Sequence, residues 1–153
     1  MVVISFLLFF GILFSPSPLL AQTHPGYEKF NLSEKDEAQI LFARARYKES
    51  IEKFKDVLKS EGEASTTFRM MLKAWKAVEG LGDAEQFLQD YLASNKGSTH
   101  IWYAFGYLNY LKADYGKAEK NFEEALKMNP ENGLALNNLG AIFSEKKQYA
   151  LAI

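Results

Sequence analysis

The side chains that most often hold metals or carry out nucleophilic catalysis are scarce in this chain. Its 153 residues contain two histidines, His24 and His100, and no cysteine. A protein zinc site needs three or four Cys, His or carboxylate ligands brought together. Neither histidine has an acidic residue at a repeat spacing beside it, so we expect no metal site and no metal cofactor.

Acid–base and phosphate-binding patterns are also missing. Asp36 with Glu37, and Glu123 with Glu124, are direct sequence neighbours and would point in different directions from a helix, so we interpret them as solvated surface. No glycine-rich loop stands between a strand and a helix, so nothing favours nucleotide binding. We therefore expect no catalytic residues, no cofactor and no enzymatic activity.

The composition of the chain limits the class of partner that it can bind. The apolar fraction is 48%, the charged fraction 24% and the formal net charge −1. These values are ordinary for a domain with a packed core. Binding to a nucleic-acid backbone needs a clustered excess of Lys and Arg, so we expect no nucleic-acid partner.

The N-terminus differs from the rest of the chain. Residues 1–21 carry no charge, and Val2 to Phe14 is an apolar run of the length of a signal-peptide core. The Ser-Pro-Ser-Pro stretch that follows breaks any helix, and cleavage after Ala21 would remove the segment. We predict a signal peptide over 1–21, with an uncleaved membrane anchor as the alternative, and a linker over 22–30. Either prediction places the remaining chain outside the cytoplasm, and only the N-terminal segment, if uncleaved, would contact a membrane.

From residue 31 onward the pattern is helical throughout. Apolar residues recur at three- and four-residue spacings, and breaks near 61, 80, 96 and 131 separate segments of helix length. Ser33 followed by Asp36 forms a capping-box pattern at the start of the first segment. No segment alternates with period 2, so the predicted fold class is all-α.

A fixed step of 34 residues connects the helical segments. Four columns keep this step: Phe54, Leu88 and Phe122; Tyr47, Leu81, Tyr115 and Tyr149; Ser50, Ala84, Ala118 and Ala152; Val57, Tyr91 and Ala125. Such a period indicates a solenoid of antiparallel helix pairs, each covering the apolar surface of its neighbour.

The segment Thr99 to Asn132 carries a recognisable motif. It contains Trp102, Phe105-Gly106, Tyr115, Ala118, Phe122, Ala125 and Pro130 at fixed offsets. These residues resemble the tetratricopeptide repeat. The resemblance extends over residues 31–153 and implies an α-solenoid with repeats at 31–64, 65–98, 99–132 and, truncated, 133–153.

The columns also predict the packing within each repeat. Gly106 and Gly140 should lie where the first helix presses closest on the second, with Ala118 and Ala152 facing them. We expect Trp102, Phe105 and Phe122 to fill the core between the helices. Pro130 should end the second helix of the third repeat.

Two features depart from the pattern. Glu34 and Glu37 occupy apolar positions of the first repeat, which suits either a solvent-facing terminal repeat or a shifted first helix. The fourth repeat stops about one turn into its second helix, which would expose Leu136, Leu139 and Phe143. We therefore expect a fragment of a longer protein.

The resemblance also implies a place for ligands, because members of this family usually bind them along the concave groove lined by the first helices. The corresponding positions are Arg69, Lys73, His100, Tyr103, Tyr107, Tyr110 and Asn137. The three tyrosines, at i, i+4 and i+7, would form an exposed aromatic platform beside a basic patch, suited to an extended or acidic peptide. The alternative is that these tyrosines merely cover the surface.

One binding mode of the family lacks support. Some members grip a C-terminal carboxylate with a Lys, Asn and Arg clamp, but here Met70 replaces its central Asn and Ala104 its Arg. We therefore expect no binding of chaperone tails.

The resulting prediction is an exported protein-interaction scaffold, in a bacterial periplasm or cell envelope, that binds partner polypeptides. One alternative is the recognition arm of a larger enzyme whose catalytic domain lies beyond Ile153. Another is a membrane-anchored structural spacer. The sequence predicts neither the identity of the partner nor the oligomeric state.

Overall fold

The computed structural model describes residues 32–151, with side chains up to Lys147. The predicted signal peptide over 1–21, the linker over 22–30 and His24 lie outside the described residues. No described helix combines the length and the apolar character needed to cross a membrane.

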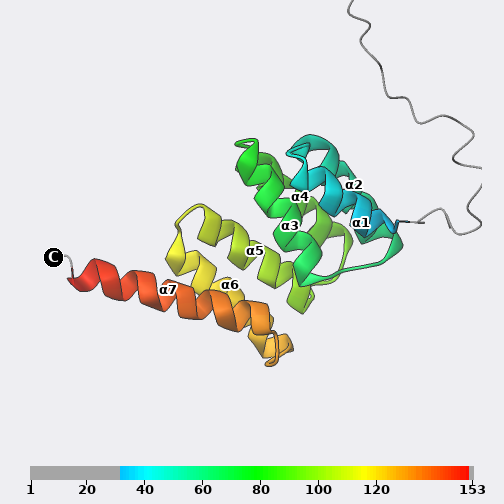
Figure 1. The fold of residues 1–153 in the computed structure, drawn as a ribbon. Coiled ribbons are helices and arrows are strands. Elements are labelled where there is room, and N and C mark those ends of the chain that lie inside the picture. The colour runs from blue at the N-terminus through cyan, green and yellow to red at the C-terminus, as the bar shows by residue number, and fades with distance from the viewer. Residues whose placement is uncertain (1–31, 152–153) are drawn as a thin grey trace, which may run out of the picture. The chain divides into compact units, whose positions relative to one another are not determined.

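The described part of the chain consists of helices and connecting turns without a strand, which confirms the predicted all-α class (Figure 1). The helices are α1 (Glu34–Ala43), α2 (Tyr47–Ser60), α3 (Ser65–Ala77), α4 (Leu81–Ser94), α5 (Thr99–Leu111), α6 (Tyr115–Met128) and α7 (Gly133–Leu151).

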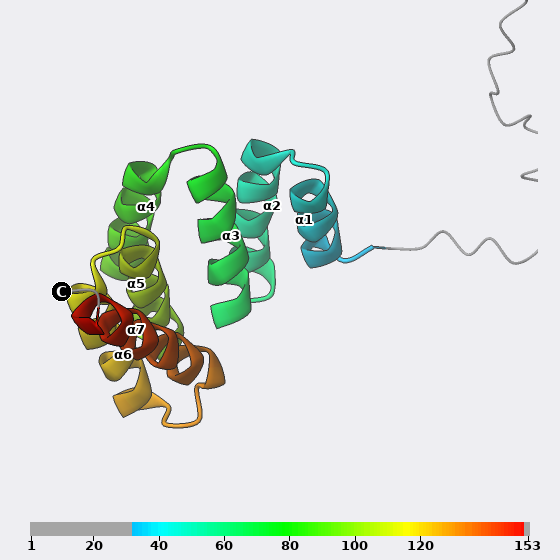
Figure 2. The same ribbon diagram turned by 60° about the vertical axis from the view of Figure 1, so that its left-hand side comes forward.

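Successive helices form antiparallel pairs that stack on one another. α1 packs on α2, α5 packs on α6, and α3 joins these pairs by contacting both α2 and α5. α7 packs on α6 and α5, so the stack continues to the end of the described chain (Figures 1 and 2). We call the surface formed by α1, α3, α5 and α7 the first-helix face.

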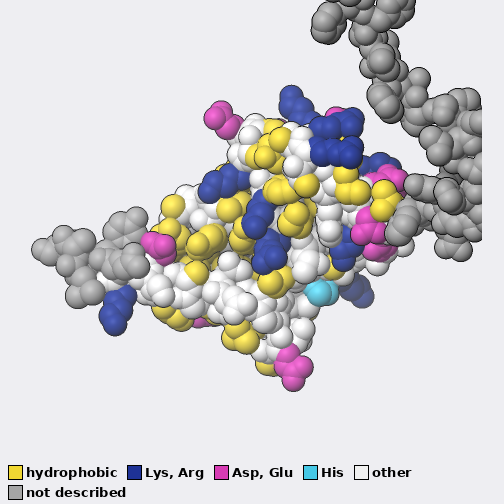
Figure 3. Space-filling model, in the orientation of Figure 1, with side chains coloured by type: hydrophobic (Ala, Val, Ile, Leu, Met, Phe, Trp, Pro, Cys, Tyr) yellow, Lys and Arg dark blue, Asp and Glu magenta, His cyan; other side chains and the backbone are white. Residues whose placement is uncertain are grey.

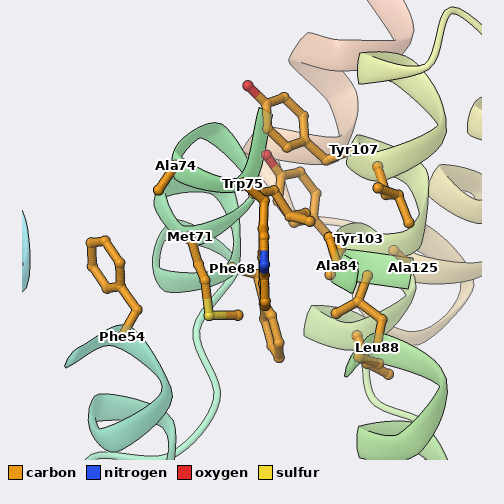
Figure 4. Close-up of a cluster of buried hydrophobic side chains, with 14 of the residues drawn as sticks. Phe54, Phe68, Met71, Ala74, Trp75, Ala84, Leu88, Tyr103, Tyr107 and Ala125 are labelled. Carbon is orange, nitrogen blue, oxygen red and sulfur yellow. The ribbon is translucent and has the colours of Figure 1, made fainter. Parts of the chain in front are cut away.

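The core follows the columns of the sequence. Phe54, Leu88 and Phe122 are fully buried, as are the small residues Ala84 and Ala118. Figure 4 shows Phe54, Met71, Phe68 and Leu88 gathered between neighbouring helices. Trp102 and Phe105 were expected in the same core but are only partly buried, and they pack on each other at the edge of α5 with ring centroids 6.1 Å apart.

Close packing at Gly106 is confirmed. A Cβ added at this glycine would lie 2.5 Å from the Phe122 ring, so no larger residue fits without a shift. The first helix therefore approaches the second at the predicted place in the third repeat.

The turns between paired helices also repeat with the 34-residue step. Ala45, Glu79 and Ala113 have φ values of 57°, 58° and 60°, in the left-handed region. A residue with a Cβ is strained there. Each of these residues lies two positions after the end of a first helix, in the turn that leads into the second helix.

The acidic first repeat keeps its register. Ser33 and Asp36 form the predicted capping box at the start of α1. Ala38, in the column of Gly106, is fully buried, and its carbonyl accepts a hydrogen bond of 2.8 Å from Ser50 Oγ. Glu37 pairs with Lys53 of α2 at 2.9 Å. The acidic side chain of Glu37 therefore forms an ion pair with α2 at the solvent-exposed end of the helix stack.

The fourth repeat departs from the prediction. We expected a turn and the beginning of a second helix at Tyr149, but α7 is one helix from Gly133 to Leu151. Lys147, in the column of the left-handed turns, is helical. The chain therefore does not turn back at Lys147 as it does at Ala45, Glu79 and Ala113.

The continuous α7 leaves one of its faces uncovered. Leu136 and Phe143 are 50% and 54% exposed, as expected, whereas Leu139 is partly buried. The close contact expected at Gly140 is wrong, because a Cβ added there would meet nothing within 4 Å.

Candidate partner-binding face

The predicted ligand-binding residues lie on consecutive first helices. Arg69 of α3, Tyr103 of α5 and Asn137 of α7 occupy one column, and Lys73 and Tyr107 occupy the next. Because α3 contacts α5 and α5 contacts α7, residues of one column lie on neighbouring helices.

Tyr103 is a core residue, so its predicted exposure is wrong. It is 0% exposed. Its ring centroid lies 5.7 Å from that of Phe122, and Asn138 Nδ2 of α7 donates to its hydroxyl at 3.4 Å. The tyrosine is therefore enclosed by α6 and α7 as well as by its own helix.

The aromatic stripe exists as a ladder rather than as an exposed platform. The rings of Tyr103 and Tyr107 stack with centroids 6.1 Å apart and an interplanar angle of 8°, and Tyr107 and Tyr110 stack at 6.1 Å and 16°. Tyr107 is only 6% exposed, and Tyr110 is partly buried against Tyr115. Figure 4 shows Tyr103 and Tyr107 side by side with their hydroxyls on the same side.

Burial changes the acidity of these phenols. It raises the pKa of Tyr103 to about 12 and also raises the pKa of Tyr107. The Arg69 guanidinium opposes both increases, because a positive charge favours the phenolate.

Arg69 has an unusual environment. The side chain is partly buried, and its Nε is enclosed without a hydrogen-bond partner among the described residues. Lys73 and Lys76, one and two turns further along α3, are exposed. Within residues 32–147, no carboxylate lies in ion-pair distance of any of the three. In Figure 3, Lys and Arg side chains run along the middle of this face while Asp and Glu lie toward its edges.

His100 and Asn137 have different surroundings from those predicted. His100 is partly buried, and its Nδ1 lies 3.0 Å from Ser65 Oγ, so it joins the start of α5 to the start of α3. Asn137 is exposed, whereas its neighbour Asn138 bonds to Tyr103 and to the Leu134 carbonyl. The family offsets point to Asn137, and the adjacent amide is the one that reaches the tyrosine ladder.

An open groove that the sequence does not predict lies between α1 and α3. It measures about 530 Å³ and is mostly apolar. Its lining residues are Leu32, Asp36, Gln39, Ile40, Phe42, Ala43 and Met70. The sequence does contain one sign of this groove, the apolar residues on one face of α1. They are hard to recognise as a face because α1 is short and rich in acidic residues. We call this the α1–α3 groove.

A second hollow lies between α2, α3 and α4. It measures about 410 Å³ and includes Trp75 and Phe87. Lys55 Nζ covers these rings, 5.7 Å and 5.6 Å from their centroids. A cation in this position gains from the ring faces, so this hollow is already occupied by the protein's own side chain.

Comparisons with known proteins agree with this architecture. A sequence model of the tetratricopeptide repeat matches residues 121–153. Among solved structures, the chain is similar to the first TPR domain of the human RPAP3 protein, with a TM-score of 0.56 and 18% identity over 78% of this chain and 94% of that domain. No curated protein matches the sequence significantly. Residues 121–153 therefore match the tetratricopeptide repeat, and the chain has the all-α fold of a tetratricopeptide-repeat domain.

Proposed function

We propose that this protein is an exported scaffold that binds a partner polypeptide along its first-helix face. The observation that carries the proposal is the placement of the α1–α3 groove beside a row of unpaired cations on α3. Apolar and charged contacts are thus available side by side, as recognition of a peptide requires.

The shape of the face favours an extended or helical segment over a small molecule. The α1–α3 groove is open, and Ile40, Phe42 and Met70 offer apolar contact along it. Small-molecule sites are usually enclosed clefts that bury most of the ligand. An open groove on stacked helices instead suits a chain that continues from one helix to the next.

Export is proposed from the first 21 residues. Their lack of charge and their apolar run support a signal peptide, and the absence of cysteine from the chain is compatible with any redox compartment. We propose a bacterial periplasm or cell envelope as the site of action.

Site-specific crosslinking tests the binding face. A photoreactive residue replaces Gln39 or Lys73 on the first-helix face, and as matched controls it replaces Gln89 of α4 or Lys120 of α6. All four side chains are exposed. We expect the first two positions to crosslink one polypeptide in an envelope extract, identified by mass spectrometry, and the controls to crosslink it at least about tenfold less, because binding energy concentrates in a defined part of an interface.

Equal crosslinking from all four positions would overturn the assignment of the face. Crosslinking only from α4 and α6 would move the interface to the second helices. Recovery of the protein in the cytoplasmic fraction, with Met1 at its N-terminus, would contradict the proposed export.

A further inference from the structure

One side of α7 is apolar and is not covered by the described chain. Leu136 and Phe143 are 50% and 54% exposed, and Gly140 lies between them on the same side of the helix, because residues three and four apart share a face. Ala135 and Ile142 are instead fully buried, on the side where α7 packs on α5 and α6. Exposed apolar side chains that cluster in this way often mark an interaction site. We call Leu136, Gly140 and Phe143 the α7 stripe.

The third repeat shows what a glycine in this column can receive. Gly106 lies one repeat before Gly140, and a Cβ added to it would be 2.5 Å from the Phe122 ring of the antiparallel helix α6. A Cβ added to Gly140 would meet nothing within 4 Å. Gly140 is therefore an open notch, and the same fold fills the equivalent notch with an aromatic ring from an antiparallel helix.

The α7 stripe carries a ring that matches its own notch. When two copies of a helix pair antiparallel about a two-fold axis, every contact occurs twice. The register that places Phe143 of one copy on Gly140 of the other therefore fills both notches at once. Leu136 lies one turn from Gly140, so it would contact the same ring and extend the apolar surface that is buried.

The charges beside the α7 stripe are compatible with this pairing. Lys147 is exposed one turn beyond Phe143, and in this register its aliphatic stem would cover Leu136 of the other copy while its ammonium stays in water. The two Lys147 positions would be about 16 Å apart along the helices, which is beyond the screening length at physiological salt. The neighbouring Lys146 already pairs with Glu119 of α6.

We propose that a second copy of this chain docks on α7, with the Phe143 ring of each copy in the Gly140 notch of the other. This inference goes beyond the proposed function and does not depend on it. One helix pair is a small interface, so we expect a dissociation constant on the order of 10 to 100 µM. Because the α1–α3 groove lies at the other end of the stack from α7 (Figure 1), the dimer would present two such grooves and would bind a partner with two recognition segments more tightly than the monomer.

Sedimentation equilibrium of the full chain measures the dissociation constant. Phe143→Ala removes the ring and Gly140→Leu fills the notch, so each should weaken association at least about tenfold. Leu32→Ala is the matched control, because it removes an exposed apolar side chain near α1, at the opposite end of the stack. It should leave the dissociation constant within about twofold, as is usual for a surface substitution outside an interface.

Two further measurements locate the interface and exclude unfolding. The chain has no cysteine, so Ser144→Cys beside the α7 stripe should give a covalent dimer with a short bismaleimide, whereas Gln89→Cys, exposed on α4, should not. Gly140→Leu should melt at no lower temperature than the parent chain, because the described structure has room for a side chain there and leucine has the higher helix propensity.

A chain that stays monomeric at about 500 µM would overturn the inference, because that concentration is above the expected dissociation constant. Association that Phe143→Ala and Gly140→Leu leave unchanged would also overturn it, and would place self-association elsewhere, for example in residues 2–14. A crosslink from Ser144→Cys to a different polypeptide in place of the dimer would assign the α7 stripe to that polypeptide and reject the second copy. Loss of the crosslinks from Gln39 and Lys73 with the dimer intact would remove the proposed function alone.

Discussion

Two glycines of one column have opposite surroundings, although the sequence treats them alike. A Cβ at Gly106 would lie 2.5 Å from the Phe122 ring, whereas a Cβ at Gly140 would meet nothing within 4 Å. The difference arises because α6 packs against Gly106, while none of the described helices covers Gly140. The 34-residue column predicts which positions allow close helix packing. Whether a second helix packs there determines which of these positions are in close contact.

Gly106→Ala should therefore lower the free energy of unfolding by about 1–3 kcal/mol, the usual cost of overpacking a core. Gly140→Ala is the matched control and should raise it by about 0.5–1 kcal/mol, since alanine has the higher helix propensity. Urea unfolding of both variants measures the difference. A loss of stability at Gly140 equal to that at Gly106 would contradict the described surroundings of the two helices.

Tyr103 is a residue whose exposure is predicted wrongly from its position in the family's repeat pattern. The offset correctly places the residue on a first helix, but α6 and α7 enclose it and leave 0% of its surface exposed. Substitution by alanine should therefore destabilise the protein by about 3–5 kcal/mol, as for other buried aromatic residues. A tyrosine exposed on a platform, as the sequence predicts, would instead tolerate this change.

The raised pKa of Tyr103 also predicts that the free energy of unfolding falls at alkaline pH. Its pKa is raised to about 12, above the value of about 10 in the unfolded chain. The folded state thus favours the neutral phenol, so this stabilisation is complete below about pH 10 and is lost as the pH rises toward about 12. Tyr103→Phe should flatten the fall in unfolding free energy between about pH 9 and about pH 11.5, measured by urea titration. An unchanged slope in that variant would show that Tyr103 does not carry the effect.

At the scale of elements, the turns between paired helices store backbone strain. Ala45, Glu79 and Ala113 all adopt positive φ, and the 34-residue step puts one such residue at each turn. The sequence predicts a break near Glu79 but none near Ala45 or Ala113, and it predicts no left-handed conformation at any of them, because alanine and glutamate carry no signal for that region. The conformation is imposed by the second helix packing back on the first.

Ala113→Gly should stabilise the protein by up to about 1 kcal/mol, because glycine adopts the left-handed region without the strain of a Cβ. Ala93→Gly, at an exposed position within α4, is the control and should destabilise by about 0.5–1 kcal/mol. Thermal unfolding followed by circular dichroism measures both. Destabilisation of similar size at the two positions would argue against the described turn.

α7 shows the limit of the periodic pattern. The column of Tyr47, Leu81 and Tyr115 marks the start of α2, α4 and α6, but Tyr149 lies inside α7. A helix pair forms where both helices are long enough to bury apolar surface against each other, because nucleating a helix is costly and packing supplies most of its stability. The 34-residue pattern alone does not specify whether both helices of a pair can bury enough apolar surface.

For the whole molecule, the sequence predicts the architecture far better than the binding face. The positions of Phe54, Leu88 and Phe122 follow from a simple step in the chain, and all three are buried in the structure. The residues that would face a ligand do not follow from such a regular step in the sequence. The α1–α3 groove and the orphan Nε of Arg69 depend on how neighbouring helices meet, which no single segment of sequence specifies.

The proposed scaffold function depends on which layer of helices contacts the partner. The first-helix face combines the α1–α3 groove with unpaired cations on α3, whereas the hollow between α2, α3 and α4 is covered by Lys55. Protection from hydrogen exchange on binding the polypeptide identified by crosslinking tests this most directly. The account predicts slower exchange in α1, α3 and the middle of α5, and little change in α2, α4 and α6. Protection confined to α2, α4 and α6 would contradict it.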